Sequence, residues 1–101
     1  MDPVVTVTIP HGHGKPEATH RIKAAIDDAR TSYAAKFKVA EEKWDGDRLT
    51  FRIAVLGQVI TGTIDVADDN VRGEIKMTWL MAHLVKPAEA FMKEAGERAL
   101  A

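Results

Sequence analysis

LTFRIAVLGQVITGTIDVADDNVRGEIKM, residues 49–77, is the stretch that decides the fold. Apolar and polar side chains alternate in three runs, which is the period-two pattern of strands with one buried face. Gly57 separates the first two runs, and Asp68-Asp69-Asn70 supplies turn chemistry before the third. This pattern predicts an antiparallel meander with one covered face. The inward positions are Leu49, Phe51, Ile53, Val55, Ile60, Gly62, Ile64, Val66, Val71, Gly73, Ile75 and Met77.

Two weaker strand patterns precede the meander. Val5, Val7 and Ile9 alternate with neighbours that face the other way, which predicts a short strand that Pro10 ends. Residues 37–44 are ambiguous, because Phe37 and Val39 point one way and Ala40 and Trp44 the other. We expect an edge-like strand there, and Asp45-Gly46-Asp47 predicts the hairpin turn that follows.

Two segments have helical periodicity. The first starts near Pro16, which suits a first helical turn, and runs to about Lys36. The second runs from about Trp79 to Leu100, with a broader apolar face. Pro87 predicts either a kink near Lys86 or two helical pieces, the second opened by Pro87. The expected buried positions are Ala18, Ile22, Ala25, Ile26, Ala29 and Tyr33 in the first helix and Leu80, Leu84, Ala88, Phe91 and Ala95 in the second, with Met81, Val85 and Met92 widening the second face.

These elements predict one α+β domain over residues 1–101. Its antiparallel sheet has about five strands in the order β-α-β-β-β-β-α, and both helices lie on one face. Short loops, the lack of a repeat and the length of 101 residues all favour a single core.

Composition excludes several classes of function. The chain has no cysteine, so thiolate metal sites, disulfides and cysteine nucleophiles are excluded. Fourteen basic and 15 acidic residues are interspersed and give a net charge of -1, which argues against a nucleic acid partner. No basic leader and no run of membrane-spanning length is present, so we expect a cytoplasmic protein.

The loop 11–14 contains the polar side chains that most resemble part of a metal-binding or anion-binding site. His11 and His13 are one residue apart and, with His20 from the helix, resemble part of a metal site, but Zn²⁺ prefers four donors. The favoured interpretation is a solvated loop of uncertain role, His11, His13 and Gly14, in which His11 helps to anchor the helix start. Gly12 and Gly14 before a helix could attract an anion, although their spacing fits no phosphate-binding motif.

No residue set predicts an active site. Asp65, Asp68 and Asp69 fit a hairpin turn better than a calcium loop or an acid/base pair. Ser32 is the only serine and lies in a helix without a paired histidine. We therefore expect no catalytic residue, no metal, no cofactor and no enzymatic activity.

Four stretches resemble the polyhydroxyalkanoic acid system proteins, a family of short bacterial proteins named for genes near those of polyhydroxyalkanoate storage granules. They are Ile9-Pro10-His11 with Gly14 and Ala18, residues 44–51, residues 57–66, and Trp79-Leu80. His13 and Pro16 depart from the family pattern. The resemblance implies a cytoplasmic accessory or regulatory protein of the granule system and a fold related to helix-grip domains, without a settled activity or cofactor.

Two hypotheses about function follow. In the first, the chain is a non-enzymatic interaction protein that binds a granule-associated protein or the granule surface, through Trp79, Met81, Val85, Phe91 and Met92. Trp79 has two interpretations, an exposed partner contact or a residue packed on the rim of the core. In the second hypothesis, the chain carries a hydrophobic acyl ligand between the sheet and the last helix. A homodimer is a further expectation. The polar outer face of the sheet could pair two subunits, although such faces are usually solvated.

Overall fold

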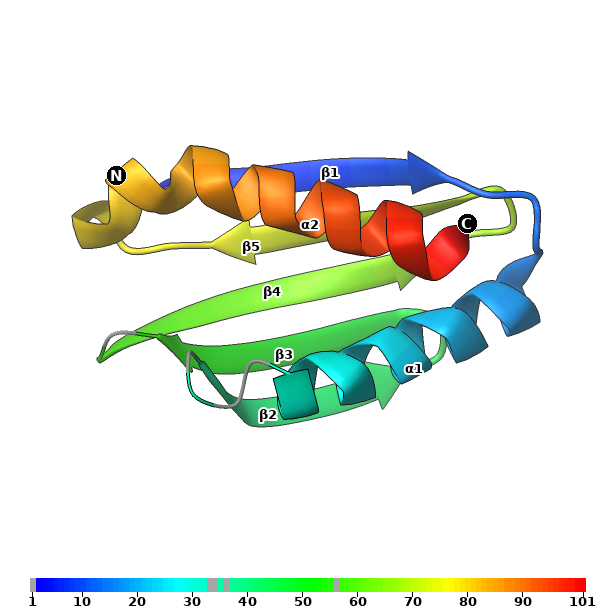
Figure 1. Ribbon diagram of the computed structural model, residues 1–101, viewed down its shortest axis with the longest axis horizontal. Coiled ribbons are helices and arrows are strands. Elements are labelled where there is room, and N and C mark those ends of the chain that lie inside the picture. Colours follow the sequence, from blue (N-terminus) through cyan, green and yellow to red (C-terminus); the bar gives the residue numbers. More distant parts are fainter. Residues whose placement is uncertain (1, 33–34, 36, 56) are drawn as a thin grey trace.

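Two helices cover one face of a five-stranded antiparallel sheet in the computed structural model, which describes residues 2–32, 35, 37–55 and 57–101 (Figure 1). The elements are β1 (Val4–Pro10), α1 (Lys15–Ser32), β2 (Lys38–Asp45), β3 (Arg48–Val55), β4 (Gln58–Val66), β5 (Asn70–Lys76), a 3₁₀ helix η1 (Trp79–Leu84) and α2 (Val85–Leu100). The predicted α+β class and the element order are confirmed.

The strands are arranged in the order β1-β5-β4-β3-β2. β2 to β5 form the predicted meander, and β1 pairs antiparallel with β5, so that Val7 lies opposite Gly73. The first strand of the chain thus lies beside the last one. β1 and β2 are the two edges of the sheet, which confirms the edge-like character expected for residues 37–44.

The alternation read from the sequence matches the observed burial. Val5, Ile9, Leu49, Ile60 and Val66 are buried, whereas their strand neighbours Thr6, Thr8, Thr50 and Thr61 are exposed. Because successive side chains of a strand point to opposite faces, one face of the sheet meets the helices and the other faces water.

The helices divide the core into two clusters. α1 places Ala18 and Ile22 in a cluster with Ile9, Val66, Val71 and Leu100. Met81 of η1 packs in the second cluster with Val5, Ile60, Ile75 and Met77. In Figure 1 α2 lies in front of β1 and β5 and α1 in front of the β2 side of the sheet, with the C-terminal end of α2 close to the N-terminal half of α1.

Glycines permit the closest approaches in this core. A Cβ atom at Gly96 of α2 would overlap Cδ1 of Ile9, and one at Gly73 would lie 3.2 Å from Cε of Met92. At Gly62 a Cβ atom would overlap the ring of Phe51, which lies directly across the β3–β4 pair. Side chains from β1, α2 and β3 therefore occupy the space that a larger residue at Gly96, Gly73 or Gly62 would need.

The C-terminal segment forms two helical pieces, η1 and α2, which was one of the two alternatives predicted from Pro87. The second piece begins at Val85 rather than at Pro87, so the proline occupies the third position of α2. A proline there costs no hydrogen bond, because the first four N–H groups of a helix lack intrahelical partners. The predicted end of the first helix near Lys36, and Tyr33 on its face, lie outside the described residues.

Candidate functional site

The loop between β1 and α1 is held by its two histidines. The Nε2 atom of His11 lies 3.0 Å from the carbonyl oxygen of Ala67, in the β4–β5 turn. The Nε2 atom of His13 lies 2.8 Å from the carbonyl oxygen of Leu100, at the end of α2. Because a carbonyl oxygen only accepts, both rings donate from Nε2. The loop is thereby fixed to two segments that are distant in sequence.

His11 also orders the loop internally. The backbone N–H of His13 donates to Nδ1 of His11 over 3.2 Å, which requires that this nitrogen carry no proton. The two imidazole rings stack with their centroids 5.9 Å apart, and the backbone N–H of His11 donates to the carbonyl of Asp69. His11 therefore ties the loop to the β4–β5 turn rather than directly to the helix start, and His13, from the same loop of uncertain role, ties it to the end of α2.

This geometry leaves few ring nitrogens available as ligands for a metal ion. Three of the four ring nitrogens of His11 and His13 already serve in hydrogen bonds. His20 is exposed on α1, and within the described residues no group of three or more His, Asp or Glu side chains is placed to hold an ion. The loop, interpreted from the sequence as solvated, is thus partly buried and linked to the sheet and to α2 by its histidines.

The acidic residues near the β4–β5 turn are also structurally engaged. Asp65 receives two hydrogen bonds from the guanidinium of Arg48, its cross-strand neighbour, at 2.6 and 3.3 Å. This hydrogen bond and the carboxylate charge raise the pKa of Arg48. The carboxylate of Asp69 accepts from Asn70 over 2.7 Å. Asp68 and Asp69 therefore lie in the turn between β4 and β5, as expected, whereas Asp65 belongs to β4 and pairs across the sheet with Arg48 of β3.

The five residues predicted as a partner contact do not form one surface. Met81 is only 3% exposed and packs in the core, so its assignment to a surface contact needs correction. Val85 and Met92 are half-buried against the same cluster. Trp79 and Phe91 remain accessible, with 65% and 42% of their surface exposed.

Leu80, which the sequence pattern assigned to the core, is instead 53% exposed. The reason is the 3₁₀ geometry of η1, in which residues three apart share a face. Met81 and Leu84 therefore point inward, whereas a continuous α-helix would have turned Leu80 inward with Leu84. Pro87 signalled the break, but the change of helical period was not apparent from the sequence.

η1 is fixed at the end of the sheet by the N-terminal segment. The backbone N–H of Trp79 donates to a carboxylate oxygen of Asp2 over 3.2 Å, and the N–H of Met77 donates to the carbonyl of Pro3 over 3.0 Å. Thr78 lies within 3.5 Å of Gln58 at the start of β4. Trp79 and Leu80, which we call the η1 contact, are thus two exposed apolar side chains on a turn with defined backbone partners.

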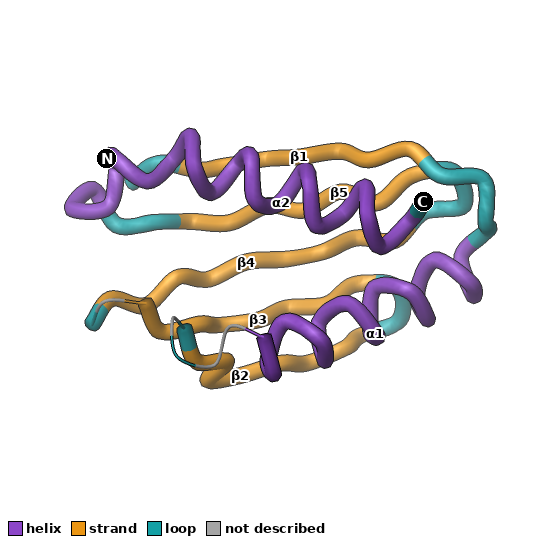
Figure 2. Tube along the Cα trace, viewed as in Figure 1, coloured by secondary structure: helices purple, strands orange, loops and turns teal. Residues whose placement is uncertain are grey.

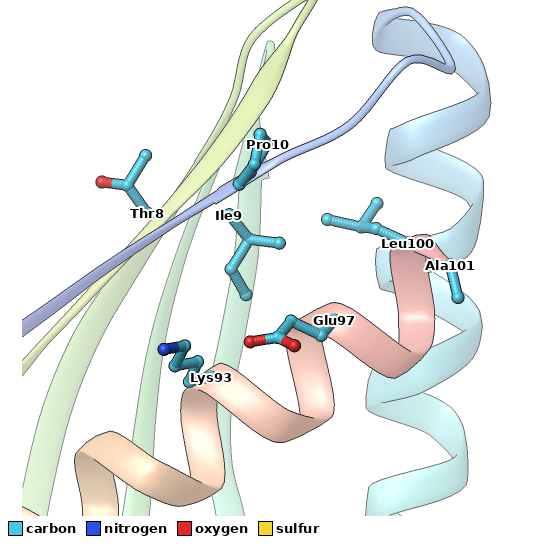
Figure 3. A pocket seen from close by; sticks show the side chains of 7 residues that line it. All are labelled: Thr8, Ile9, Pro10, Lys93, Glu97, Leu100 and Ala101. Atoms are coloured by element: carbon cyan, nitrogen blue, oxygen red, sulfur yellow. The ribbon is translucent and has the colours of Figure 1, made fainter.

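A second surface feature lies between β1 and the C-terminal half of α2. It is an open depression of about 370 Å³, which Figure 3 shows from close by. Ile9 and Leu100 form its apolar floor, and Lys93 and Glu97 contribute charged groups.

Within the described residues, no helix is both long and apolar enough to cross a bilayer.

Comparison with known proteins identifies a family. No curated protein and no solved structure matches the chain. The family model described as "Putative polyhydroxyalkanoic acid system protein" matches residues 5–95, which include α1, most of α2 and all of the sheet except Val4. The chain therefore belongs to this family of polyhydroxyalkanoic acid system proteins.

Proposed function

We propose that this chain is a non-enzymatic accessory protein of the polyhydroxyalkanoate system, which binds the surface of storage granules through the η1 contact. Membership of the family supports the link to the granule system. The observation that carries the mode of action is the exposure of Trp79 and Leu80 side by side, at 65% and 53%. Single exposed apolar residues are ordinary on protein surfaces, but an adjacent Trp and Leu form a contact that an apolar surface can bury.

The local backbone supports this proposal, because the contact is preorganised. Asp2 accepts a hydrogen bond from Trp79, and Pro3 accepts one from Met77. The position of η1 is therefore defined before any partner binds. Binding then requires little ordering of the chain, which reduces the entropic cost of association. Trp is also favoured at boundaries between water and an apolar phase, because its ring is amphipathic.

The absence of enzymatic activity is part of the proposal. His11 and His13 donate to backbone carbonyls, and Asp65 pairs with Arg48. A nucleophile or general base needs a group free to reach a substrate, and these side chains are engaged in holding the fold.

The arrangement of α2 favours surface contact over the carriage of an acyl ligand. Ile9 packs against Gly96 and Met92 lies against Gly73, so side chains occupy the space between the sheet and α2 at these levels. The depression of about 370 Å³ lies between β1 and the C-terminal half of α2, but it is open to solvent and has charged groups from Lys93 and Glu97, which suits an enclosed acyl chain poorly.

Granule sedimentation with the purified, tagged chain tests the proposal. Wild-type protein mixed with isolated polyester granules should float or sediment with them on a density gradient. The double variant W79S/L80S should bind on the order of 100-fold more weakly, because burial of these side chains contributes about 3 kcal/mol. The conservative variant W79F/L80M should retain binding.

Val59→Ser is the matched control. Val59 is 47% exposed, and it lies on β4 rather than on η1. Its replacement removes exposed apolar surface without changing the η1 contact, and granule binding should persist. Equal binding of wild type and W79S/L80S would refute the proposal.

A further inference from the structure

The two edges of the sheet differ in how they are protected. Edge strands expose unpaired backbone groups, and proteins usually protect them with charges or bulges. β2 has both: its sequence KVAEEKWD contains five charged residues, and its pairing with β3 shifts register between Val39 and Glu41. Glu42 of β2 also forms an ion pair with Arg30 of α1. β2 is therefore a poor partner for another strand.

β1 lacks these protective features. Its sequence, VVTVTIP, contains no charged residue and is rich in β-branched side chains, which favour strand pairing. Its pairing with β5 runs in continuous register from Val4 to Pro10, without a bulge. Figure 2 shows β1 at one border of the sheet, and β5 is its only strand partner within the described residues.

The free backbone groups of β1 can be identified from its bonds to β5. The carbonyl of Pro3 accepts from Met77 and the N–H of His11 donates to Asp69, so the odd-numbered residues direct their backbone groups toward β5. In an antiparallel ladder the alternate residues point the other way. The N–H and C=O groups of Val4, Thr6 and Thr8 therefore face outward, and Pro10 follows at the end, where a missing N–H matters least.

α2 carries a row of alternating charges, and the C-terminal members of the row lie beside this edge. Lys86, Glu89, Lys93 and Glu97 lie three or four positions apart, and all four are exposed. Lys93 and Glu97 line the depression next to Thr8 and Pro10 (Figure 3). Among the described residues none of the four has an ion-pair partner, whereas Glu94 and Arg98 of the same helix pair with each other.

The midpoint of this row coincides with the midpoint of β1. Glu89 and Lys93 flank position 91, with Lys86 and Glu97 farther out on either side. Met92 packs against Gly73, which is the cross-strand partner of Val7, the central residue of β1. A twofold axis through Val7 would thus bring each lysine of the row toward a glutamate of the other chain.

We propose that a second copy of this chain docks on β1, so that the two β1 strands pair antiparallel about Val7 and the two sheets become one. Thr6 then lies opposite Thr8 of the partner, and Val4 lies opposite Pro10. This register makes about six interchain backbone hydrogen bonds, because each Thr pair exchanges two and each Val–Pro pair makes one. The two α2 helices run antiparallel on the same face.

The charged row gives this dimer its register and its preference for the antiparallel orientation. Glu89 faces Lys93 of the partner, and Lys86 faces Glu97 of the partner. Exposed ion pairs contribute more to specificity than to affinity. A parallel arrangement would lose the alternation that makes the row self-complementary. The proposed pairing uses β1 and the charged row and no residue of η1, so it is independent of the η1 contact.

Sedimentation equilibrium and native mass spectrometry of the purified chain provide the test. We expect a wild-type dimer. Thr6→Pro removes an outward N–H without removing a bond to β5, and a proline is tolerated on such an edge. This variant should raise the dissociation constant on the order of 10-fold or more, since it removes two backbone hydrogen bonds at the interface. Thr6→Val, which retains the N–H, should leave it unchanged, and circular dichroism should show all three proteins folded.

A charge-swap pair tests the orientation. The acidic variant K86E/K93E and the basic variant E89K/E97K should each dimerise more weakly than the wild type, because like charges then face one another. An equimolar mixture should form a one-to-one heterodimer. A monomeric wild type overturns the proposal. A dimer that remains intact in T6P and in both charge variants also overturns it, because an interface on the outer face of the sheet would behave in that way.

Discussion

The imidazole of His13 donates a hydrogen bond to the backbone carbonyl of Leu100, so a loop before α1 is attached to the last residue of α2. Leu100 is itself buried in the cluster that contains Ala18 and Ile22 of α1. The hydrogen bond and this apolar packing together join the two helices at one end of the sheet. His13, which the sequence analysis placed in a solvated loop of uncertain role, thus contributes to tertiary packing.

Replacement of His13 with alanine should destabilise the protein. Loss of this hydrogen bond should cost about 1 kcal/mol and lower the midpoint of thermal unfolding by roughly 5 °C, because the Leu100 carbonyl then lacks a protein partner. Differential scanning calorimetry measures the change. His20→Ala is the control, because His20 is exposed on α1, and equal midpoints for the two variants would contradict the structural role.

Gly96→Ala should also destabilise the protein, against the usual preference of helices for alanine. Alanine favours a helix interior by about 1 kcal/mol over glycine, but its Cβ would overlap Cδ1 of Ile9, and overpacking costs about 1–3 kcal/mol. Ile9→Val removes that Cδ1 atom. The double variant I9V/G96A should therefore be more stable than G96A alone, as measured by urea unfolding, and additive effects of the two substitutions would exclude the close contact.

Met81→Lys should unfold the protein or weaken it severely. Met81 is 3% exposed, so the variant loses core packing and buries an ammonium group, with a cost of about 3 kcal/mol or more. Trp79→Ser, two residues away, should change stability by no more than about 0.5 kcal/mol, because Trp79 is mostly exposed. Chemical denaturation of both variants separates the core face of η1 from its exposed face, and a stable M81K protein would contradict the observed packing.

Zinc should not stabilise the chain. Chelation by both rings would require His11 to give up its hydrogen bond to Ala67 or the one it accepts from His13, and within the described residues no group of three His, Asp or Glu side chains is placed to complete a site. Thermal unfolding with a molar excess of Zn²⁺ should match unfolding with a chelator. A rise in the unfolding midpoint that disappears in the variant H11A/H13A would instead show that the loop binds metal.

Local chemistry in the sequence determined most of the secondary structure. Strict alternation from Leu49 to Met77 gives the register of the meander, because a shift of one residue would turn every apolar side chain to water. Pro87 marks the division of the C-terminal helix, and Asp-Gly-Asp and Asp-Asp-Asn mark two turns. Even the edge position of residues 38–45 was apparent, since their mixed pattern does not suit a central strand.

Tertiary structure decided which strands pair, which side chains are buried and which polar groups bond to one another. Nothing local in Val4–Pro10 specifies pairing with β5, because that ladder joins residues far apart in sequence and depends on the shared core. The inward turn of Met81 and the outward turn of Leu80 depend on the 3₁₀ geometry of η1, held at Asp2. The histidines acquired their partners in the same way, since the carbonyls of Ala67 and Leu100 reach the loop only after the sheet and both helices have packed.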